Sequence, residues 1–282
     1  MGAPRALVGL ALAVSACAPV HNYDDPRGPR YAVAASPRPD PSPVLKVVTF
    51  NVRYALFAPR AAEVLVRTPA LSDADLVVLQ EMDLPGVQVI ASALAMNAVY
   101  YPAAVHHRHG KDFGNAVLFR GPIEADGKLL LPHPARIRGM QRIATWATVK
   151  VGGWPVRVYS VHLGAASDVF PAARMAQVQA ILEDARAHER VIVAGDFNER
   201  TAVGRAFEAA GYTWLTRDAG PTVSRFSWDH LFARGLEPAR PEGWGVADPA
   251  GASDHSPVWA ALLVPELSAS NTARRTASIP TP

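Results

Sequence analysis

The chain of 282 residues contains a single cysteine, Cys17. One cysteine cannot form an intrachain disulfide, so a disulfide framework is excluded. Charge is also sparse: 19% of the residues are Asp, Glu, Lys or Arg, and the net charge is +3. So small a positive excess over this length does not indicate nucleic acid or membrane as a partner. The sequence also lacks an internal repeat of solenoid length. Its 49% hydrophobic content is ordinary for a soluble globular protein with a sizeable core.

The N-terminal sequence MGAPRALVGLALAVSAC is typical of a secretory signal peptide over residues 1–17. It has an early Arg5, an apolar stretch too short to span a bilayer, and small residues at its end. Its last four residues, VSAC, resemble the lipobox of bacterial lipoproteins, in which the cysteine carries a lipid and becomes the first mature residue. An ordinary cleaved signal peptide and a slightly apolar disordered start are the alternatives.

The sequence after Cys17 bears on localisation and domain organisation. Ala18 is not an acidic retention signal, which favours the outer membrane or cell surface for an envelope lipoprotein; without the lipid, the protein would be secreted. Residues 18–43 are dense in Pro, Asp and Arg and predict an extended, solvated tether. The tail over 267–282 is expected to be disordered in the same way. Residues 44–266 remain as one domain of about 220 residues, within the single-domain range of α/β folds.

Several apolar segments of this domain end in polar residues. The segment VLKVVTFNVRY, which begins at Val44, predicts a strand that reaches Asn51. After a helical pattern around residues 61–65, ADLVVLQEMD predicts a strand that ends at Gln80 and Glu81. Further strands are predicted at 114–119, 142–151 and 156–164, and a helix from about 168 to 188.

The segment VIVAGDFNER, residues 191–200, shows the pattern most clearly. Its four apolar residues suit a strand that is buried on both faces, and Gly195 permits a sharp turn or a close approach. Asp196 and Asn198 follow at once. A purely local explanation is that Asp196 caps a helix near Thr201 or starts a turn.

Histidines and acids recur at other strand boundaries. VRVYSVHLG delivers His162, RFSWDHLFA places Asp229 in an aromatic strand, and GASDHSPVWAALLV places Asp254 and His255 before a final apolar strand. Each residue has a structural alternative, as a surface acid or as a hydrogen-bonded core or turn histidine. Their joint recurrence at strand ends predicts a shared site.

The motifs TFNVR, LQEMD, GNAVLF, VHL, GDFNE, WDHLF and SDHSPV follow the order found in the endonuclease/exonuclease/phosphatase superfamily, which has the DNase I-like fold. The region from Lys46 to about Val264 resembles that superfamily. The resemblance implies an α/β four-layer sandwich, in which two mixed β-sheets pack face to face with helices on the outside. It also implies a site at one end, where both sheets deliver polar groups to a common cleft.

The resemblance further implies the roles of the site residues. Mg²⁺, with Mn²⁺ as a possible substitute, would be bound by Glu81 and Asn51, with Asp254 nearby. His255 would take a proton from the attacking water, and Asp229 would hold its other nitrogen. The remaining catalytic candidates orient the water and the phosphate or donate to a nonbridging oxygen; they are Asp196, Asn198 and His162. Asn115 and Arg142 are weaker candidates for substrate binding, with a turn residue and a strand-edge arginine as their structural alternatives.

The implied function is hydrolysis of a phosphomonoester or phosphodiester by in-line attack of a His-activated water, in an exported envelope protein. The substrate could be a lipid headgroup, an inositol phosphate or nucleic acid. Abasic-site endonucleases of the superfamily have an acid at the position of Arg53 and a tyrosine at that of His162, so a DNA-repair role is disfavoured. An extracellular nuclease and a non-catalytic envelope binding module are the alternatives, and no protein partner is implied.

The segment YYPAAVHHRHGKDFG, residues 100–114, stands out by its cluster of histidines and basic residues. It could contact an anionic headgroup or a strand phosphate, with its tyrosines as a stacking face. The alternative is a solvated hairpin loop. A zinc site is disfavoured because no cysteine or suitably spaced carboxylate accompanies the histidines.

Overall fold

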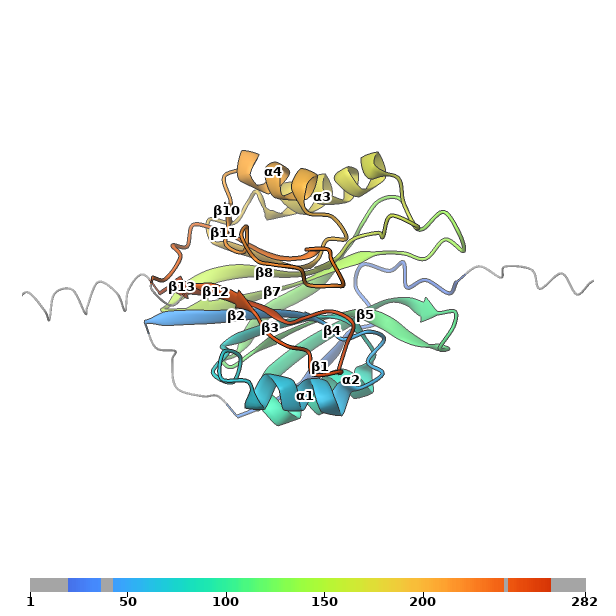
Figure 1. The fold of residues 1–282 in the computed structure, drawn as a ribbon. Helices are drawn as coiled ribbons and strands as arrows, with labels where there is room; N and C mark the ends of the chain where they lie inside the picture. The colour runs from blue at the N-terminus through green and yellow to red at the C-terminus, as the bar shows by residue number, and fades with distance from the viewer. Residues whose placement is uncertain (1–19, 37–42, 241–242, 265–282) are drawn as a thin grey trace, which may run out of the picture.

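The computed structural model describes residues 20–36, 43–240 and 243–264. The predicted signal peptide with Cys17 and the predicted tail over 267–282 lie outside these residues. Figure 1 shows two β-sheets packed face to face, with a pair of helices covering the outer face of each sheet. The helices are α1 (Ala58–Arg67), α2 (Leu84–Leu94), α3 (Pro171–Ala185) and α4 (Thr201–Ala209). None of the helices in the described part of the chain is long and apolar enough to cross a membrane.

The two sheets are both mixed, which confirms the predicted fold class. The first has the order β1-β4-β5-β3-β2-β13-β12, with β2 and β3 parallel, and the second has the order β10-β11-β9-β8-β7-β6, with β8 and β9 parallel. The strands of the first sheet are β1 (Tyr31–Val33), β2 (Val44–Asn51), β3 (Leu76–Met82), β4 (Asn97–His106), β5 (Lys111–Phe119), β12 (Trp244–Val246) and β13 (Val258–Leu263). Those of the second are β6 (Ile123–Leu130), β7 (Ile143–Val151), β8 (Trp154–His162), β9 (Val191–Asp196), β10 (Thr213–Trp214) and β11 (Asp229–Arg234).

Three apolar clusters join the four layers. The central cluster lies between the sheets and includes Val78 of the first sheet and Val158 and Ile192 of the second, all fully buried. Separate clusters join the first sheet to α1 and α2 and the second sheet to α3 and α4. Strands such as β9 are therefore buried on both faces, which explains their unbroken apolar sequence. This leaves the strand ends as the places for polar groups.

The prediction of a solvated tether is wrong for residues 20–36. β1 pairs antiparallel with β4, and Arg30 makes two hydrogen bonds, each of 2.6 Å, to Asp126. The backbone of Tyr23 also pairs with Ala103. A Pro-rich segment without apolar periodicity resembles a free tether in sequence, because its partners lie 65 to 96 positions further along the chain. The folded body therefore begins before Val44.

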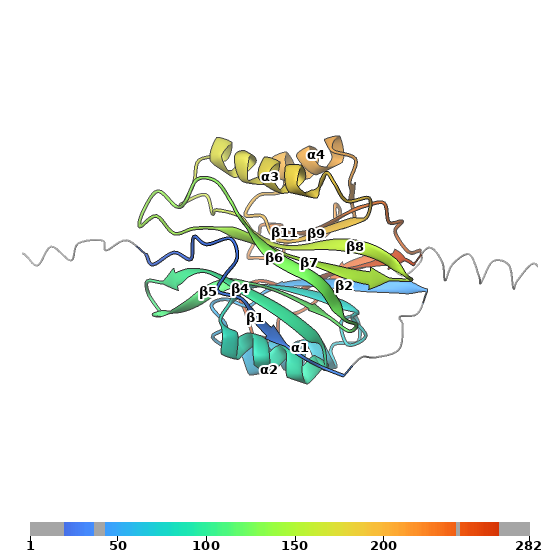
Figure 2. The same cartoon turned by 180° about the vertical axis from the view of Figure 1, so that it is seen from behind.

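The histidine-rich segment at 100–114 is mostly strand. β4 ends at His106 and β5 begins at Lys111, so only residues 107–110 form the turn of the hairpin. Figure 2 shows this hairpin projecting at the same end of the molecule as the segment that follows β6, with the N-terminal segment between them. The sequence of β4 shows no alternation of polar and apolar residues, because both faces of the strand are buried along almost its whole length.

Candidate active site

Three adjacent strands of the second sheet, β8, β9 and β11, place predicted site residues side by side at one end of the strands. His162 at the end of β8 is the register partner of Asp196 at the end of β9. Asp196 is in turn the partner of Asp229 at the start of β11. All three side chains are nearly fully buried. Sheet pairing thus joins residues that are more than thirty positions apart in the sequence.

Gly195 is required by the close approach of β9 to β8. A Cβ atom at this position would lie 1.9 Å from the carbonyl oxygen of Val161, closer than any real contact. The glycine therefore allows the parallel pairing to continue to the last residue of β9, where Asp196 enters the cleft.

The first sheet delivers Asn51 and Glu81 from the parallel strands β2 and β3. The pairing of β3 with β5 is irregular between Leu79 and Met82, and Glu81 has a left-handed φ of 58°. Such an irregularity redirects a side chain that would otherwise follow the strand alternation. Gln80 points between the sheets instead, where its Nε2 donates to Ser160 Oγ at 3.1 Å. Glu81 is consequently free to face the cleft.

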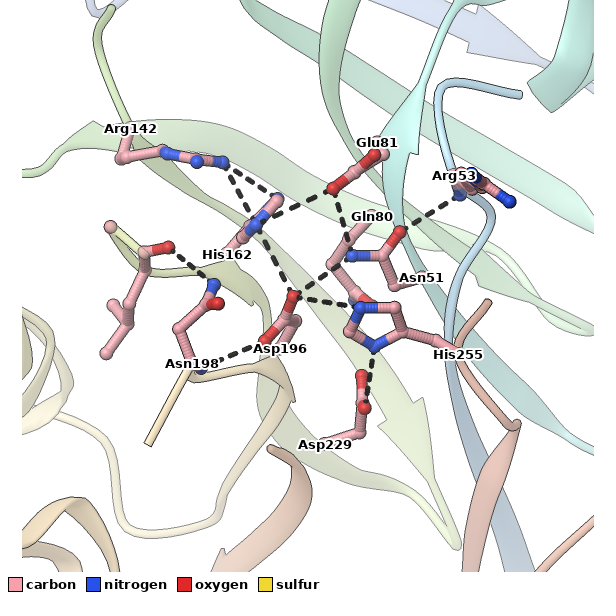
Figure 3. Close-up of polar contacts among 12 residues, drawn as sticks. Asn51, Arg53, Gln80, Glu81, Arg142, His162, Asp196, Asn198, Asp229 and His255 are labelled. Carbon is pink, nitrogen blue, oxygen red and sulfur yellow. Dashed lines mark hydrogen bonds and ion pairs between the residues drawn. The ribbon is translucent and has the colours of Figure 1, made fainter. Parts of the chain in front are cut away.

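Asn51 connects the acids of the two sheets. Its Nδ2 donates to Glu81 Oε1 at 3.2 Å and to Asp196 Oδ2 at 3.0 Å, as Figure 3 shows. Glu81 Oε2 accepts a hydrogen bond from the backbone of Tyr54 at 3.1 Å. Two carboxylates and an amide therefore meet where the sheets converge.

His255 lies against two aspartates. Its Nδ1 is 2.8 Å from Asp229 Oδ2, and its Nε2 is 3.8 Å from Asp196 Oδ2. Asp229 Oδ2 also accepts a 2.6 Å hydrogen bond from the hydroxyl of Thr222. Thr222 fixes Asp229 and is buried, but an isolated threonine in a loop gives no sequence signal for such a role.

The buried charges shift one another's pKa values. Burial raises the pKa of Glu81 to about 7 and that of Asp196 to about 6. Burial alone would lower the pKa of His255, but the carboxylates of Asp229 and Asp196 more than offset it and raise that pKa to about 10. Shifts of this kind are characteristic of functional sites.

Arg142 and His162 form a second group in the cleft. Arg142 Nη1 lies 3.0 Å from His162 Nε2, and Arg142 Nη2 donates to Asp168 Oδ2 at 2.8 Å. Burial, followed by the charge of Arg142, lowers the pKa of His162 well below its usual value. His162 is therefore a neutral imidazole with one N–H to donate. Asp168 was not predicted, because an acid just before a helix indicates a local cap.

The other predicted residues occupy different places. The backbone N–H of Asn198 donates to Asp196 Oδ1 at 2.9 Å, and Asn198 lines the cleft. Asp254 is exposed, with Oδ2 3.5 Å from Arg53 Nε, and lies outside the group formed by Asn51 and Glu81.

Asn115 corrects the prediction of a substrate-binding side chain. It is buried, and its Nδ2 donates to the carbonyls of Ile143 at 2.9 Å and Ser160 at 3.1 Å. It thereby joins the two sheets and does not line the cleft. The sequence motif placed it at a strand, but only the packing of the second sheet over β5 reveals which way it faces.

The cleft itself has a volume of about 270 Å³. Four of the five catalytic candidates line it, namely His162, Asp196, Asn198 and His255, and other lining residues are aromatic. The aromatic residues include Tyr54, His106 and Phe113, with ring centroids 4.5–5.8 Å apart. This volume lies just below the range of pockets for drug-sized ligands and suits a compact group.

The cleft fits a divalent cation. Glu81 and Asp196 offer buried carboxylate oxygens, and burial raises the pKa of both acids. Asn51 presents its Nδ2 to these acids, while its Oδ1 accepts a 3.0 Å hydrogen bond from the backbone N–H of Arg53. Its amide would therefore have to turn over before its oxygen could join the two carboxylates as a ligand. Ligand atoms of Asp196, Asp229 and His255 also lie within 4.8 Å of one another. However, His255 Nδ1 is already engaged with Asp229. The all-oxygen set is the better match to a hard cation such as Mg²⁺.

Fold and site together define a class of α/β sandwich proteins in which two sheets build one buried acid–histidine cleft. The family model described as Endonuclease/Exonuclease/phosphatase family matches residues 48–255, and the chain belongs to that family. The DNase I-like resemblance is thereby confirmed. Enzymes of this family generally depend on divalent metal ions. A comparison with curated proteins finds no match.

Solved structures of similar fold include three with named activities. Zebrafish (D. rerio) TDP2 complexed with a single-strand DNA product is 20% identical, with a TM-score of 0.63, covering 78% of this chain and 98% of its own. The mannosyl-6-phosphatase Bt3783 of Bacteroides thetaiotaomicron is 20% identical, with a TM-score of 0.57; the match covers 78% of this chain and 99% of the phosphatase. Sphingomyelinase C of Streptomyces griseocarneus is 20% identical, with a TM-score of 0.57; the match covers 79% of this chain and 100% of the sphingomyelinase.

Proposed function

We propose that this protein is a Mg²⁺-dependent phosphohydrolase that cleaves phosphate esters by attack of a His255-activated water. One observation carries the proposal: His255 is held by Asp229 on one nitrogen and faces Asp196 with the other. A general base needs this arrangement, because the carboxylate fixes the imidazole and stabilises the imidazolium after proton transfer. Of the acids and histidines expected of such a site, Asp254 lies outside the group, and the others lie together: Glu81, His162, Asp196, Asp229 and His255.

The chain's own groups divide the work. His255 Nε2 takes the proton of the attacking water, and Asp196 orients that water from the opposite side. His255 must be neutral at that moment, whereas the uncompensated charges of Asp229 and Asp196 favour its protonated form. A cation bound by Glu81 and Asn51 would supply positive charge that stabilises the phosphoryl oxygens and the leaving group. The same charge would also oppose protonation of His255.

His162, Arg142 and Asn198 complete the phosphate site. Neutral His162 donates its N–H to a nonbridging oxygen, and Arg142 adds a buried positive charge beside it. Asn198 lines the same cleft, where its side chain is held by the carbonyl of Leu163 at 3.1 Å. The donors are fixed before substrate arrives, so little reorganisation is needed as charge develops.

The substrate is a phosphate ester of a compact alcohol. TDP2, the mannosyl-6-phosphatase and sphingomyelinase C, by their names and titles, concern single-strand DNA, a sugar phosphate and a sphingolipid. What these compounds share is a phosphate ester, and the volume of the cleft favours a small group. Extracellular nuclease activity remains the second candidate because the ssDNA-bound structure shares the fold.

The direct test is hydrolysis of a panel of sugar, inositol, nucleotide, lipid and DNA phosphates by the whole chain, with Mg²⁺ and with chelator. We expect turnover of at least one class with Mg²⁺ and none with chelator, restored by added Mg²⁺. The release of phosphate or alcohol measures it. A folded protein that turns over no member with any divalent ion would favour the non-catalytic binding module.

Mg²⁺ is expected to stabilise the protein more at about pH 8 than at about pH 5. The folded-state pKa values of Glu81 and Asp196, about 7 and 6, lie above their unfolded values. Protons therefore stabilise the folded state, and the free energy of unfolding falls as pH rises through this window. At low pH, Mg²⁺ must displace these protons, whereas at high pH it binds ionised carboxylates.

Melting temperature with Mg²⁺ minus that with chelator, at matched ionic strength, measures this effect. An increase that is equal at the two pH values, or larger at the lower one, would show that Glu81 and Asp196 do not form the cation site.

We also propose that the protein is exported and anchored through a lipid on Cys17. The motif VSAC and the preceding apolar stretch support this. After a high-salt wash, which removes protein held at the membrane by charge alone, the protein is expected to stay in the membrane fraction of a bacterial host, and Cys17→Ser is expected to be released. Equal distribution of the two forms would rule out the lipid and leave ordinary secretion.

A further inference from the structure

Two segments at one end of the molecule carry exposed apolar side chains beside the cleft. Ile137 is 65% exposed in the turn at 136–139, and Phe170 is 61% exposed just before α3. The turn leads directly to Met140 and Arg142, which line the cleft, and Phe170 follows Ser167 and Asp168, which also line it. The exposed pair is therefore placed around the entrance to the catalytic groups.

Two arginines belong to the same turn as Ile137, and one of them contacts Phe170. The guanidinium of Arg136 lies 4.1 Å from the ring centroid of Phe170, and the backbone N–H of Arg136 donates to the carbonyl of Asp168 at 2.9 Å. Arg138 follows in the same turn. Within the described residues, no carboxylate forms an ion pair with either arginine, while Asp168 is already paired with Arg142. We call Arg136, Ile137, Arg138 and Phe170 the rim patch; it is basic and apolar at once.

The start of the described chain lies directly against this patch. The N–H of Val20 donates to the carbonyl of Arg138 at 3.1 Å, and Asn22 Nδ2 donates to the carbonyl of Gly139 at 2.8 Å. Figure 1 shows this N-terminal segment between the hairpin of β4 and β5 and the segment that contains the turn. The end of the chain that carries Cys17 thus leaves the folded body beside the cleft.

The length of chain outside the structure sets how far an anchor could be. Cys17 precedes Val20 by three residues, which span at most ~10 Å even when fully extended. A lipid on Cys17 would therefore hold the rim patch within about that distance of the bilayer surface. Exposed apolar side chains with neighbouring arginines are the composition that binds an anionic lipid interface.

We propose that the rim patch docks on an anionic lipid bilayer, so that the cleft receives its phosphate ester from the membrane surface. The second half of this proposal rests on the proposed phosphohydrolase function, whereas the docking itself does not. Partly inserted Ile137 and Phe170 would supply apolar contact, and Arg136 and Arg138 would face the anionic headgroups.

Vesicle sedimentation tests the docking. The protein is the chain from residue 17 onward with Cys17→Ser, which keeps every described residue but carries no lipid. It is mixed with vesicles of phosphatidylcholine alone or of phosphatidylcholine with phosphatidylglycerol. The first variant combines Arg136→Glu and Arg138→Glu, and the second combines Ile137→Asp and Phe170→Asp. The matched control combines Arg205→Glu on α4 and Val89→Asp on α2, both exposed and remote from the patch.

We expect the parent and the control to bind the anionic vesicles, and each patch variant to bind at least ~10-fold less, since one basic residue near an anionic surface contributes about a five-fold preference. Hydrolysis of a soluble phosphate ester should stay unchanged in all variants. Patch variants that bind as the parent does, or a parent that binds neither vesicle, would overturn the docking. A parent that docks through the patch but hydrolyses no ester would refute the proposed function alone.

Discussion

The substitution His255→Ala is expected to lower kcat at least about 10³-fold on any ester that the parent hydrolyses. A general base contributes about 10²- to 10⁴-fold, and among the described histidines that line the cleft only His255 makes a hydrogen bond to a carboxylate that would stabilise its protonated form. His162 is neutral, but its ring nitrogens lie beside Arg142, whose positive charge opposes proton acceptance. KM should change little, because the phosphate contacts of Arg142, His162 and Asn198 remain.

Loss of the imidazole also leaves Asp229 buried without its cationic partner, so stability must be checked separately. Melting temperature and circular dichroism measure this stability.

The double variant of His255→Ala and Asp229→Asn should be no slower than His255→Ala alone, because the two residues act as one unit. His133→Asn is the matched control: its exposed side chain lies outside the cleft, and its left-handed backbone suits asparagine. A folded His255→Ala variant with kcat within tenfold of the parent would remove His255 from the mechanism.

The strand ends at Asn51, Glu81, His162 and Asp196 could be predicted because a buried strand leaves an unbroken apolar run that stops abruptly at the polar residue. The segments that escaped prediction lack such a run. β1 is three residues long and gains its stability from pairing with β4, while α2 has apolar residues on most of its circumference. The local sequence does not reveal that β1 pairs with a distant strand, nor does it show α2 as an amphipathic pattern.

Within the site, the sequence predicted the charged residues but not the residues that fix their side chains by hydrogen bonds. Thr222, which bonds Asp229, and Asp168, which pairs with Arg142, act through neighbours that are distant in the chain. Asn115 illustrates the opposite error: its position in the motif suggested substrate binding, yet its amide hydrogens are used between the sheets. Which face a polar residue presents depends on strand register and sheet packing, and these emerge only in three dimensions.

The substitution Glu81→Gln is expected to remove the Mg²⁺-dependent rise in melting temperature and to lower turnover at least about 10²-fold at moderate Mg²⁺. The replacement keeps the shape and left-handed backbone of the residue but deletes the only carboxylate that the first sheet contributes to the cleft lining. A hard cation loses most of its attraction when one of two anionic ligands becomes neutral. High Mg²⁺ should recover part of the turnover, which a general loss of structure would not allow. Glu63→Gln on the exposed face of α1 is the control.

The comparison with Asp229→Asn decides between the two possible cation sites. If the ion is bound by Glu81, Asp196 and Asn51, Asp229→Asn should lower kcat through His255 and still leave the Mg²⁺-dependent rise in melting temperature. If it is bound by Asp196, Asp229 and His255, the rise should vanish in Asp229→Asn and persist in Glu81→Gln. The second pattern would also remove His255 as the base, since a nitrogen that ligates a metal has no lone pair for the proton of water. Because the two patterns are opposite, calorimetric melts of the two variants with Mg²⁺ and with chelator separate the metal-binding group from the proton-transfer group.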